Sequence, residues 1–487
     1  SHTLLRAKNM GSSVSIIKLL FPTVLLAFLL YSALPAAALS KTHGELRGEN
    51  MSLEAYQVDL RDLLHLLQEQ GVSVHIDPRI KPKVSASFSN QPVDRVLSAI
   101  LKSYDYSTVW QKTDTSKGDH LHLVELRIFE QGLEYRTVSL KSSVNLAIGR
   151  NADVRYVKNS LLVKLLPGTD HHVLEDLLTK VGGYNIEPAN DFGVIRISLP
   201  DSVSPEEAAK LLSQSDIIAA AEPDYAFRLP EATLPINPNE GVEPEDFETG
   251  PGQALPMVAV LDSGLAEHFE DGDFVSSFYD AVAGTAGASD RVGHGTQMSL
   301  IAAGVVQPLG TRSDEEGNLP IIAVRAFDDN GYTSNYTLMR GIDYALDSGA
   351  RIISMSWGTE TPNSMFESIV EYASSHGAVL LAAAGNSPSG LPVYPAAYEE
   401  VIGVGALNPD GSVWDQSNFG ESVSVWAPGV VVVDDGGNND KKAYVGTSVA
   451  TAYMAKRVAG FLKEHPEMDV SSIWRQISVG GISGQST

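Results

Sequence analysis

From position 257 onward, short apolar runs alternate with amphipathic segments, and this alternation constrains the fold more than any other feature. The runs cover 257–261, 321–326, 352–355, 379–383 and 401–404. None alternates with polar residues, which is typical of strands that are buried on both faces. Two intervening segments have helical periodicity and end at Gly349 and Gly377. The sequence predicts an α/β fold over residues 253–487: a doubly wound parallel sheet whose site lies at the carboxyl ends of the strands.

Three glycine-flanked motifs fall where a predicted strand ends or a predicted helix begins. Asp262 lies in V-L-D-S-G, His294 in G-H-G-T and Ser448 in G-T-S-V-A. A serine hydroxyl becomes a nucleophile when a base removes its proton, and a carboxylate can orient that base. Read singly, the three residues also fit a turn, a helix start and a helix N-cap. Their joint occurrence predicts Ser448 as nucleophile, His294 as general base and later acid, and Asp262 as the orienting group.

In motifs and in chain order, residues 257–460 resemble the subtilisin-like serine proteases. The resemblance implies an endopeptidase that hydrolyses peptide bonds in proteins or peptides through an acyl-enzyme, without a cofactor. It also implies that Asn386, in A-A-A-G-N, donates a hydrogen bond to the oxyanion, with the Ser448 amide as second donor. The intact set of Asp262, His294, Asn386 and Ser448 favours this reading over a second one. That alternative is a catalytically idle envelope interaction protein that uses the protease fold as a scaffold.

Two further segments resemble substrate-binding parts of that family. Ser356, Trp357 and Gly358 match the S-x-G strand that pairs with the substrate backbone. Val393 precedes Tyr394-Pro395, where subtilisins commonly have glycine at the floor of the primary pocket. Close-packed sites do not accept extra methyl groups without strain. A preference for small or medium residues, such as Ala or Leu, over Phe or Tyr before the scissile bond is therefore predicted.

Two small α+β domains are expected ahead of the protease-like region. Residues 51–130 resemble the short N-terminal domain of secretins and TonB-dependent receptors, which implies an envelope protein as partner. An anonymous α+β extension is the alternative. Residues 156–228, which contain E-P-D-Y at 222–225, resemble the inhibitory propeptide of subtilisin-like enzymes, which acts in cis. The alternative is a spacer domain. Residues 229–252 are rich in Pro, Glu and Gly and indicate an exposed linker.

Residues 1–40 have the pattern of a secretory signal. Basic residues come first, an apolar run covers 19–34, and small residues follow up to Ala38, after which we expect cleavage. An uncleaved membrane anchor is the alternative, because 19–39 is just long enough to span a bilayer. Both readings place the remaining chain outside the cytoplasm: in the periplasm, on the cell surface or in the medium.

Composition narrows the remaining classes of site. There is no cysteine, which excludes disulfides and thiolate metal sites, and the formal net charge of -25 argues against nucleic acid as a partner.

Acidic clusters at 271–273, 328–331 and 434–440 supply the oxygen ligands that calcium prefers. Solvated loops are the favoured reading of each cluster, although the family resemblance implies that a structural calcium ion is plausible. No metal ligand is assigned.

Overall fold

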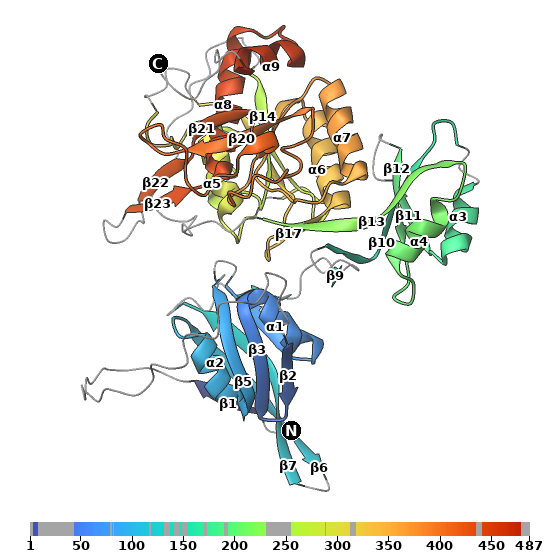
Figure 1. Ribbon diagram of the computed structural model, residues 1–487, viewed down its shortest axis with the longest axis vertical. Helices are drawn as coiled ribbons and strands as arrows, with labels where there is room; N and C mark the ends of the chain where they lie inside the picture. The colour runs from blue at the N-terminus through green and yellow to red at the C-terminus, as the bar shows by residue number, and fades with distance from the viewer. Residues whose placement is uncertain are drawn as a thin grey trace, which may run out of the picture. The chain divides into compact units, whose positions relative to one another are not determined.

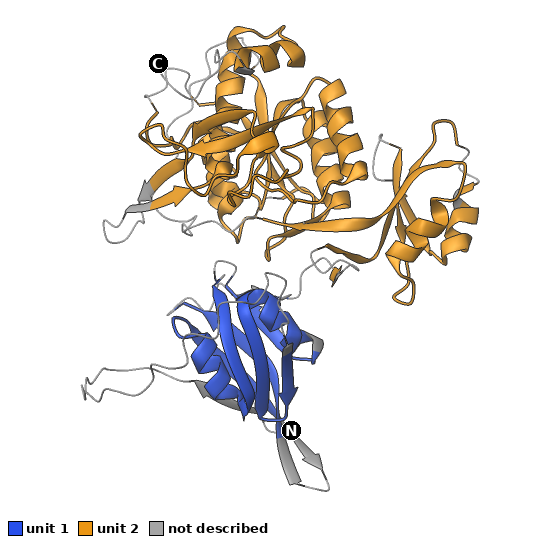
Figure 2. Ribbon diagram, in the orientation of Figure 1, with its two compact units in different colours: residues 1–141 blue, residues 142–487 orange. Residues whose placement is uncertain are grey.

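The structure is a computed structural model, and it describes residues 3–7, 43–77, 80, 82–115, 118–130, 137–140, 146–148, 154–169, 173–188, 193–229, 255–287, 289–311, 318–434 and 441–478. The chain divides into two compact units, residues 1–141 and 142–487 (Figure 2). Most of the predicted signal segment and most of the linker lie outside the described residues. Among the described residues, no helix is long and apolar enough to cross a membrane.

The first unit combines two sheets with two amphipathic helices. One sheet has the order β2-β3-β5, and the other β1-β6-β7-β4-β8. The elements are β1 (Thr3–Ala7), β2 (His43–Arg47), β3 (Asn50–Asp59), α1 (Leu60–Glu69), β4 (Ser73–Ile76), β5 (Lys83–Pro92), α2 (Val93–Ile100), β6 (Asp105–Thr115), β7 (Gly118–Phe129) and β8 (Val138–Ser139). Leu60, Leu63, Leu64 and Leu67 of α1 are buried, as their helical spacing predicts. Strand β1 was not anticipated, because its residues belong to the predicted signal.

The second unit begins with a small α+β part that we call the propeptide region, residues 146–229. Its elements are β9 (Leu146–Ile148), β10 (Arg155–Leu165), α3 (Val173–Val181), β11 (Asn185–Pro188), β12 (Val194–Ser198), α4 (Pro205–Leu212) and β13 (Ile218–Arg228). The strands β11, β12, β10 and β13 are neighbours in that order, and the helices α3 and α4 pack against each other (Figure 1). The apolar runs at 161–165 and 194–197 and the helical periodicity at 173–181 and 205–213 predict these central strands and helices.

Strand β13 is longer than the sequence predicts, because only the run at 217–221 has the apolar pattern of a strand. It continues through E-P-D-Y to Arg228 and pairs antiparallel with β17 (Tyr332–Ser334) of the following region. The partner strand lies more than a hundred positions further along the chain, so local sequence carries no sign of this pairing. The sheet of the propeptide region therefore extends into the C-terminal region, residues 255–478 (Figure 1).

The C-terminal region is built on a sheet of seven parallel strands in the order β15-β16-β14-β18-β19-β20-β21. The strands are β14 (Met257–Asp262), β15 (Val275–Asp280), β16 (Ile321–Arg325), β18 (Ala350–Met355), β19 (Val379–Ala383), β20 (Val401–Leu407) and β21 (Val425–Pro428). Strands β22 (Val430–Asp434) and β23 (Lys441–Val445) form a separate hairpin. The predicted doubly wound parallel sheet is confirmed.

Helices cover both faces of this sheet. They are α5 (His294–Ala303), α6 (Asn335–Asp347), α7 (Ser364–Ser375), α8 (Thr447–Glu464) and α9 (Val470–Ser478). Successive strand residues alternate between two hydrophobic cores: Val258 and Val260 pack with α5 and α8, whereas Ala259 and Leu261 pack with α6 and α7. Because side chains alternate along a strand, uninterrupted apolar runs are what a sheet covered on both faces requires.

Candidate active site

The carboxylate of Asp262 and the imidazole of His294 form a buried pair. His294 Nδ1 lies 2.7 Å from Asp262 Oδ1, and both side chains are buried. Asp262 is the last residue of β14, and His294 is the first residue of α5. The same Asp262 oxygen also accepts a hydrogen bond from the Ser263 amide at 2.7 Å. A carboxylate held in this way fixes the orientation of the imidazole and its Nδ1-protonated tautomer.

Two glycines allow the helix start and the strand end to approach so closely. A Cβ at Gly295 would lie 2.4 Å from the carbonyl oxygen and 2.6 Å from the nitrogen of Gly264. Gly264 has a positive φ of 119°, and a Cβ there would lie 2.0 Å from the carbonyl oxygen of Ser289. The Gly295 amide donates to Ser263 Oγ at 2.8 Å. The flanking glycines of the first two motifs thus have a steric reason, which is backbone contact between the segments that carry Asp262 and His294.

Asp290 caps the helix that carries His294. Its Oδ1 accepts a hydrogen bond from the Gly293 amide at 2.7 Å, and its Oδ2 accepts from the amide and hydroxyl of Thr296 at 2.8 and 2.7 Å. Burial raises the pKa of the Asp290 carboxyl, against the effect of these hydrogen bonds. The carboxylate therefore contacts the backbone on both sides of His294 and satisfies amides that have no partner within the helix.

Ser448 lies in the first turn of α8, which packs against α5. Its side chain is buried, and its Oγ donates a hydrogen bond to the carbonyl oxygen of Ser356 at 3.4 Å. Within the described residues, no hydrogen bond joins Ser448 Oγ to His294. The Ser448 amide is among the first four of the helix, which have no partner within the helix and carry the positive end of the helix dipole.

Asn386 follows β19 and is oriented by the residue before Ser448. Its Oδ1 accepts hydrogen bonds from the amide and the hydroxyl of Thr447, at 3.0 and 2.9 Å. The Thr447 hydroxyl also lies 3.3 Å from the amide of Gly385. With Oδ1 bound on this side, the Nδ2 group of Asn386 is available to donate to a ligand.

The predicted substrate-binding residues lie close to one another at the end of β18. Trp357 is buried in an aromatic cluster with Phe366, at 5.2 Å between ring centroids. A Cβ at Gly358 would lie 2.5 Å from Val393 Cγ1, and a Cβ at Gly385 would lie 3.5 Å from Val393 Cγ2. Val393 thus fills the space between the segment that contains Trp357 and Gly358 and the segment that ends in Asn386.

The end of the propeptide region, residues 222–229, lies along the same part of the molecule, and we call it the tail. Phe227 is buried against Trp357, with ring centroids 5.4 Å apart. Ala226, Phe227 and Arg228 pair with Ser334, Thr333 and Tyr332, and the Leu229 amide donates to the carbonyl oxygen of Gly331 at 2.9 Å. The tail is therefore bound as an added strand beside the predicted substrate-binding residues.

Two carboxylates of the tail contact the starts of helices α6 and α7. Asp224 Oδ1 accepts from the Tyr336 amide at 3.0 Å, and its Oδ2 accepts from Ser160 Oγ at 3.0 Å. Burial raises the pKa of Asp224 to about 6. Glu222 accepts hydrogen bonds from the side chains of Asn363, the N-cap of α7, and Ser364. Carboxylates are stabilising at helix N-termini, so the Glu222 contact favours docking of the tail, whereas the Asp224 contact offsets only part of the cost of burying its charge.

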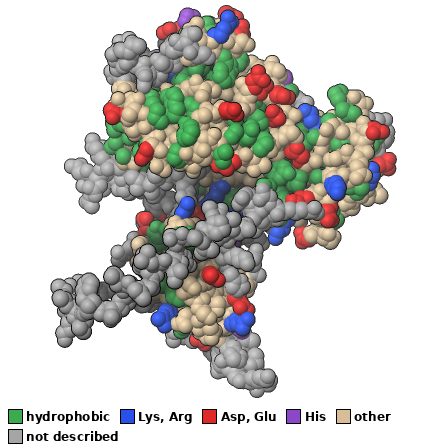
Figure 3. All heavy atoms as spheres, in the orientation of Figure 1, with side chains coloured by type: hydrophobic (Ala, Val, Ile, Leu, Met, Phe, Trp, Pro, Cys, Tyr) green, Lys and Arg blue, Asp and Glu red, His purple; other side chains and the backbone are tan. Residues whose placement is uncertain are grey.

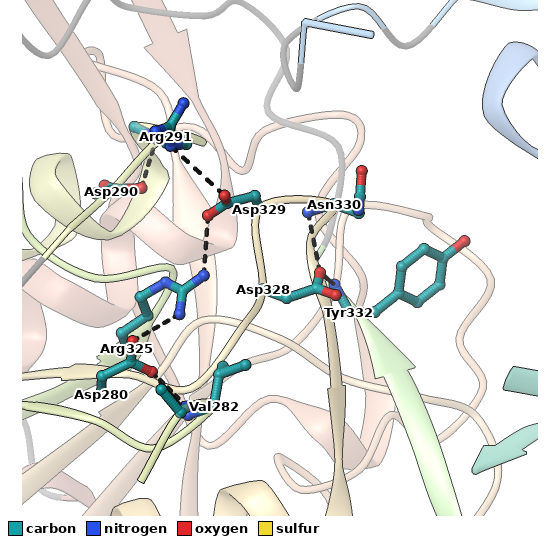
Figure 4. A network of polar contacts seen from close by, with 11 residues as sticks. Asp280, Val282, Asp290, Arg291, Arg325, Asp328, Asp329, Asn330 and Tyr332 are labelled. Carbon is teal, nitrogen blue, oxygen red and sulfur yellow. Dashed lines mark hydrogen bonds and ion pairs between the residues drawn. The ribbon is translucent and has the colours of Figure 1, made fainter. Parts of the chain in front are cut away.

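The turn before β17 is held by a network of acidic and basic side chains (Figure 4). Arg325 donates to Asp280 at 2.8 Å and to Asp329 at 2.9 Å. Asp328 Oδ1 accepts from the amides of Asn330 and Tyr332, both at 2.9 Å. Because arginines and backbone amides already engage these carboxylates, residues 328–331 do not fit a calcium site. In the described part of the chain, no three His, Asp or Glu side chains lie close enough together to bind a metal.

Comparisons with known proteins agree with this architecture. A model of the subtilase family matches residues 254–478, and a model of the fervidolysin N-terminal prodomain matches residues 142–224. The thermophilic serine proteinase of Bacillus sp. (strain AK1) is 30% identical over 327 residues, which are 64% of this chain and 79% of that protein. Thermitase of Thermoactinomyces vulgaris is 32% identical over 221 residues, 45% of this chain and 78% of that protein. The chain belongs to the subtilase family.

Among solved structures, this subtilase is similar to fervidolysin from Fervidobacterium pennivorans, described as a keratinolytic enzyme related to subtilisin. The TM-score is 0.52 at 20% sequence identity, over 69% of this chain and 59% of that chain. At this identity the likeness concerns the fold. Membership of the family makes the protein a serine endopeptidase with an N-terminal prodomain, which acts on peptide substrates and needs no cofactor for catalysis.

The structure brings the predicted site residues of this subtilase to one end of the parallel sheet. Asp262 and His294 are in contact, and Asn386 contacts the residue next to Ser448. Sequence reasoning missed Asp290, Thr447 and the strand β17. Asp290 is an ordinary loop residue in the sequence, and a three-residue strand within a polar turn has no distinct pattern. Asp290 lies just before the G-H-G-T motif and Thr447 lies within the G-T-S-V-A motif, and this proximity is the signal that the sequence offered for them.

Proposed function

We propose that Asp262, His294 and Ser448 are the catalytic triad of this serine endopeptidase. The observation that carries the proposal is the buried 2.7 Å contact between His294 Nδ1 and Asp262 Oδ1. This contact leaves His294 Nε2 to act as the base, and the helices that carry His294 and Ser448 pack against each other. Asn386, fixed through its Oδ1 by Thr447, and the amide of Ser448 are the proposed donors to the oxyanion.

In the proposed reaction, Ser448 Oγ attacks the carbonyl carbon of the scissile bond while its proton passes to His294 Nε2. Asp262 stabilises the imidazolium, and the negative charge on the carbonyl oxygen is held by Asn386 Nδ2 and the Ser448 amide. The carbon–nitrogen bond then breaks, and His294 gives its proton to the leaving amine. Water hydrolyses the acyl-enzyme by the same steps. The Ser448 hydroxyl must first turn from the Ser356 carbonyl towards His294, and such tightening on substrate binding is common.

The tail makes the enzyme a zymogen in this proposal. It is bound as a strand on β17 and buries Phe227 against Trp357, so a substrate cannot use the same surface. We expect the enzyme to cut its own chain between Tyr225 and Gly252, because the linker there is rich in Pro, Glu and Gly and is open to proteolysis. After this cut, only noncovalent contacts hold the propeptide region to the C-terminal region, so the two can separate.

A fluorophosphonate probe, which reacts with activated serines, tests the triad on the full chain. We expect labelling of the wild type and none of Ser448→Ala or His294→Ala, with Ser299→Ala, a buried serine of α5, as the labelled control. N-terminal sequencing should find the wild type cut between Tyr225 and Gly252 and Ser448→Ala intact there. Labelling of Ser448→Ala, together with peptidase activity, would overturn the assignment. An unlabelled wild type without peptidase activity would favour the idle scaffold.

The proposal places the enzyme outside the cytoplasm, on the strength of the signal pattern in residues 1–40. It assigns residues 51–130, within the first unit, to binding an envelope protein, because this unit has its own core and residues 51–130 resemble secretin and TonB-dependent receptor modules. A variant that lacks residues 43–140 should still be labelled by the fluorophosphonate but should no longer be found in the envelope fraction.

A structural calcium ion at 271–273 or 434–440 stays a prediction.

A further inference from the structure

Tyr332 of β17 contacts two arginines of the propeptide region. The guanidinium carbon of Arg228 lies 5.6 Å from the centroid of the Tyr332 ring, and that of Arg155 lies 5.7 Å from it. Arg155 Nη1 also donates to the Tyr332 hydroxyl at 2.9 Å. Both distances fall within the range in which a cation is attracted by the electron-rich face of an aromatic ring. With the propeptide region docked, Tyr332 is 1% exposed.

The strand register shows how the three side chains meet. Arg228 of β13 is directly opposite Tyr332 of β17. Arg155 of β10 is directly opposite Ala226, which lies two residues before Arg228 and therefore on the same face of the sheet. Directly paired and diagonal residues on one face of antiparallel strands are close enough to interact. The contact between Arg228 and Tyr332 thus follows from the backbone pairing and does not depend on the remaining propeptide region.

A substrate that binds as an added strand on β17 presents one residue to Tyr332, as the tail presents Arg228. We propose that Tyr332 makes the protease select a basic residue, arginine above all, at this substrate position. The inference rests on the proposed function, since it assumes that substrate and tail use the same strand in the same register. The position next to it, where the tail has Phe227, lies against Trp357. The tail then inhibits in part because it carries the residue that the enzyme prefers.

Acidic groups near β17 could also attract a basic substrate residue. The contribution of the Tyr332 ring must therefore be distinguished from theirs. Asp328 lies beside the strand, where its carboxylate accepts from the Tyr332 amide. Asp329 pairs with Arg325 at 2.9 Å and with Arg291 at 3.6 Å, which offsets its charge. The Tyr332 ring points away from Arg325 and Asp329 (Figure 4). Substitution of the ring leaves all of these carboxylates in place.

The test uses the full chain, left to process itself, and quenched fluorescent peptides that contain the tail sequence Ala226–Leu229. One peptide keeps arginine at the position of Arg228, and its partner has citrulline, which has nearly the same shape and no charge. Mass spectrometry confirms that both are cut at the same bond. For the wild type, kcat/KM should be about two- to fivefold higher for the arginine peptide, the range for a cation–π contact at an exposed site.

Three variants of Tyr332 decide the origin of this ratio. Tyr332→Phe and Tyr332→Trp keep an aromatic face and should keep the preference, whereas Tyr332→Leu should bring the ratio close to one. Fluorophosphonate labelling shows whether each variant is folded around its site. A wild-type ratio near one overturns the inference, as does a preference that survives in Tyr332→Leu, which would assign it to acidic charge. Failure of every variant and of the wild type to cut either peptide would instead overturn the proposed function, and the inference with it.

Discussion

The residue at position 295 decides how closely His294 can approach Asp262. Backbone atoms of Gly264 and Ser263 lie where a side chain at 295 would begin, at 2.4 to 2.9 Å. Backbone cannot yield as a flexible side chain can, so any Cβ there separates the start of α5 from the end of β14. At the scale of single residues, the geometry of the site depends as much on the absence of a Cβ at position 295 as on the side chains of the proposed triad.

Gly295→Ala is therefore expected to reduce activity much more than it reduces folding. A displacement of about 1 Å between catalytic groups costs on the order of a hundredfold in rate, and we expect such a loss in kcat/KM on a peptide substrate. Gly341→Ala is the control, because Gly341 also lies in a helix of the same region and its Cβ would meet side chains alone, the nearest being Val324 at 3.0 Å. Equal losses of activity in both variants would contradict this account.

The preference at the primary pocket is expected to depend on Val393. Its methyl groups occupy the space beside Gly358 and Gly385, so Val393→Gly should open room for a large side chain. Discrimination by pocket volume is worth roughly 1 to 3 kcal/mol, and the rate for Phe relative to Ala before the scissile bond should rise about 5- to 100-fold. Val393→Thr, of nearly equal volume, should keep the wild-type ratio. A peptide library reports both ratios, and an unchanged Phe-to-Ala ratio in Val393→Gly would refute the prediction.

At the scale of elements, the position of His294 depends on how α5 begins. Every residue of this helix is buried, and Asp290 supplies acceptors to its first turn. An amide has only one accepting oxygen, so Asp290→Asn leaves at least one buried amide without a partner. We expect the free energy of unfolding to fall by about 1 to 3 kcal/mol.

Urea unfolding in the Ser448→Ala background measures this loss without self-cleavage. Asp410→Asn is the matched control: Asp410 accepts from the amide and hydroxyl of Ser412 at 3.0 and 2.6 Å, but in an exposed turn. There, water replaces the lost acceptor, and the change should stay within about 0.5 kcal/mol. Equal destabilisation by the two substitutions would show that burial of Asp290 is not what matters.

Elements with a strong local pattern could be predicted from the sequence. The five apolar runs are strands of the central sheet, α5 and α8 begin at or next to the motif residues His294 and Ser448, and α6 and α7 end within two residues of Gly349 and Gly377. The extension of β13 and the strand β17 could not be predicted, because each exists by pairing with the other across a long separation in sequence. The same holds for the site: motifs predict Asp262, His294 and Ser448 as the proposed triad, whereas the contacts of Asp290 and Thr447 arise only from the folded arrangement.

At the scale of the whole second unit, the propeptide and C-terminal regions are joined by the sheet that contains β13 and β17 and by one hydrophobic cluster. Leu162, Val194, Phe227 and Leu229 pack in the same hydrophobic cluster as α6 and α7. Acidic side chains are spread over the face of this unit that Figure 3 shows, while Asp224 is buried at the junction. Docking therefore takes one carboxylate out of water, and the Tyr336 amide, the hydroxyls of Ser160 and Ser334 and the nearby charge of Arg196 compensate it in part.

The burial of Asp224 makes docking of the propeptide region dependent on pH. Its pKa is raised from 3.8 to about 6 in the docked state, mainly by desolvation. The docked state therefore binds more protons than the separated state between these values. The charged carboxylate weakens docking above pH 6, and this penalty is relieved as the pH falls, fully so below 3.8. The pKa of Glu187 is lowered mainly by its hydrogen bond to Arg196. Because both residues belong to the propeptide region, this pair is present in both states and does not make docking dependent on pH.

The propeptide region, once cut from the C-terminal region, should bind about tenfold more tightly at pH 5 than at pH 7. Gel filtration of the processed full chain over a dilution series gives the dissociation constant at each pH. Asp224→Asn, which cannot titrate but can still accept from the Tyr336 amide, should remove this part of the pH dependence. If wild type and Asp224→Asn respond equally to pH, the effect belongs to other groups. Weaker binding of the wild type at pH 5 would mean that the charged carboxylate is favoured at the helix N-terminus despite its burial.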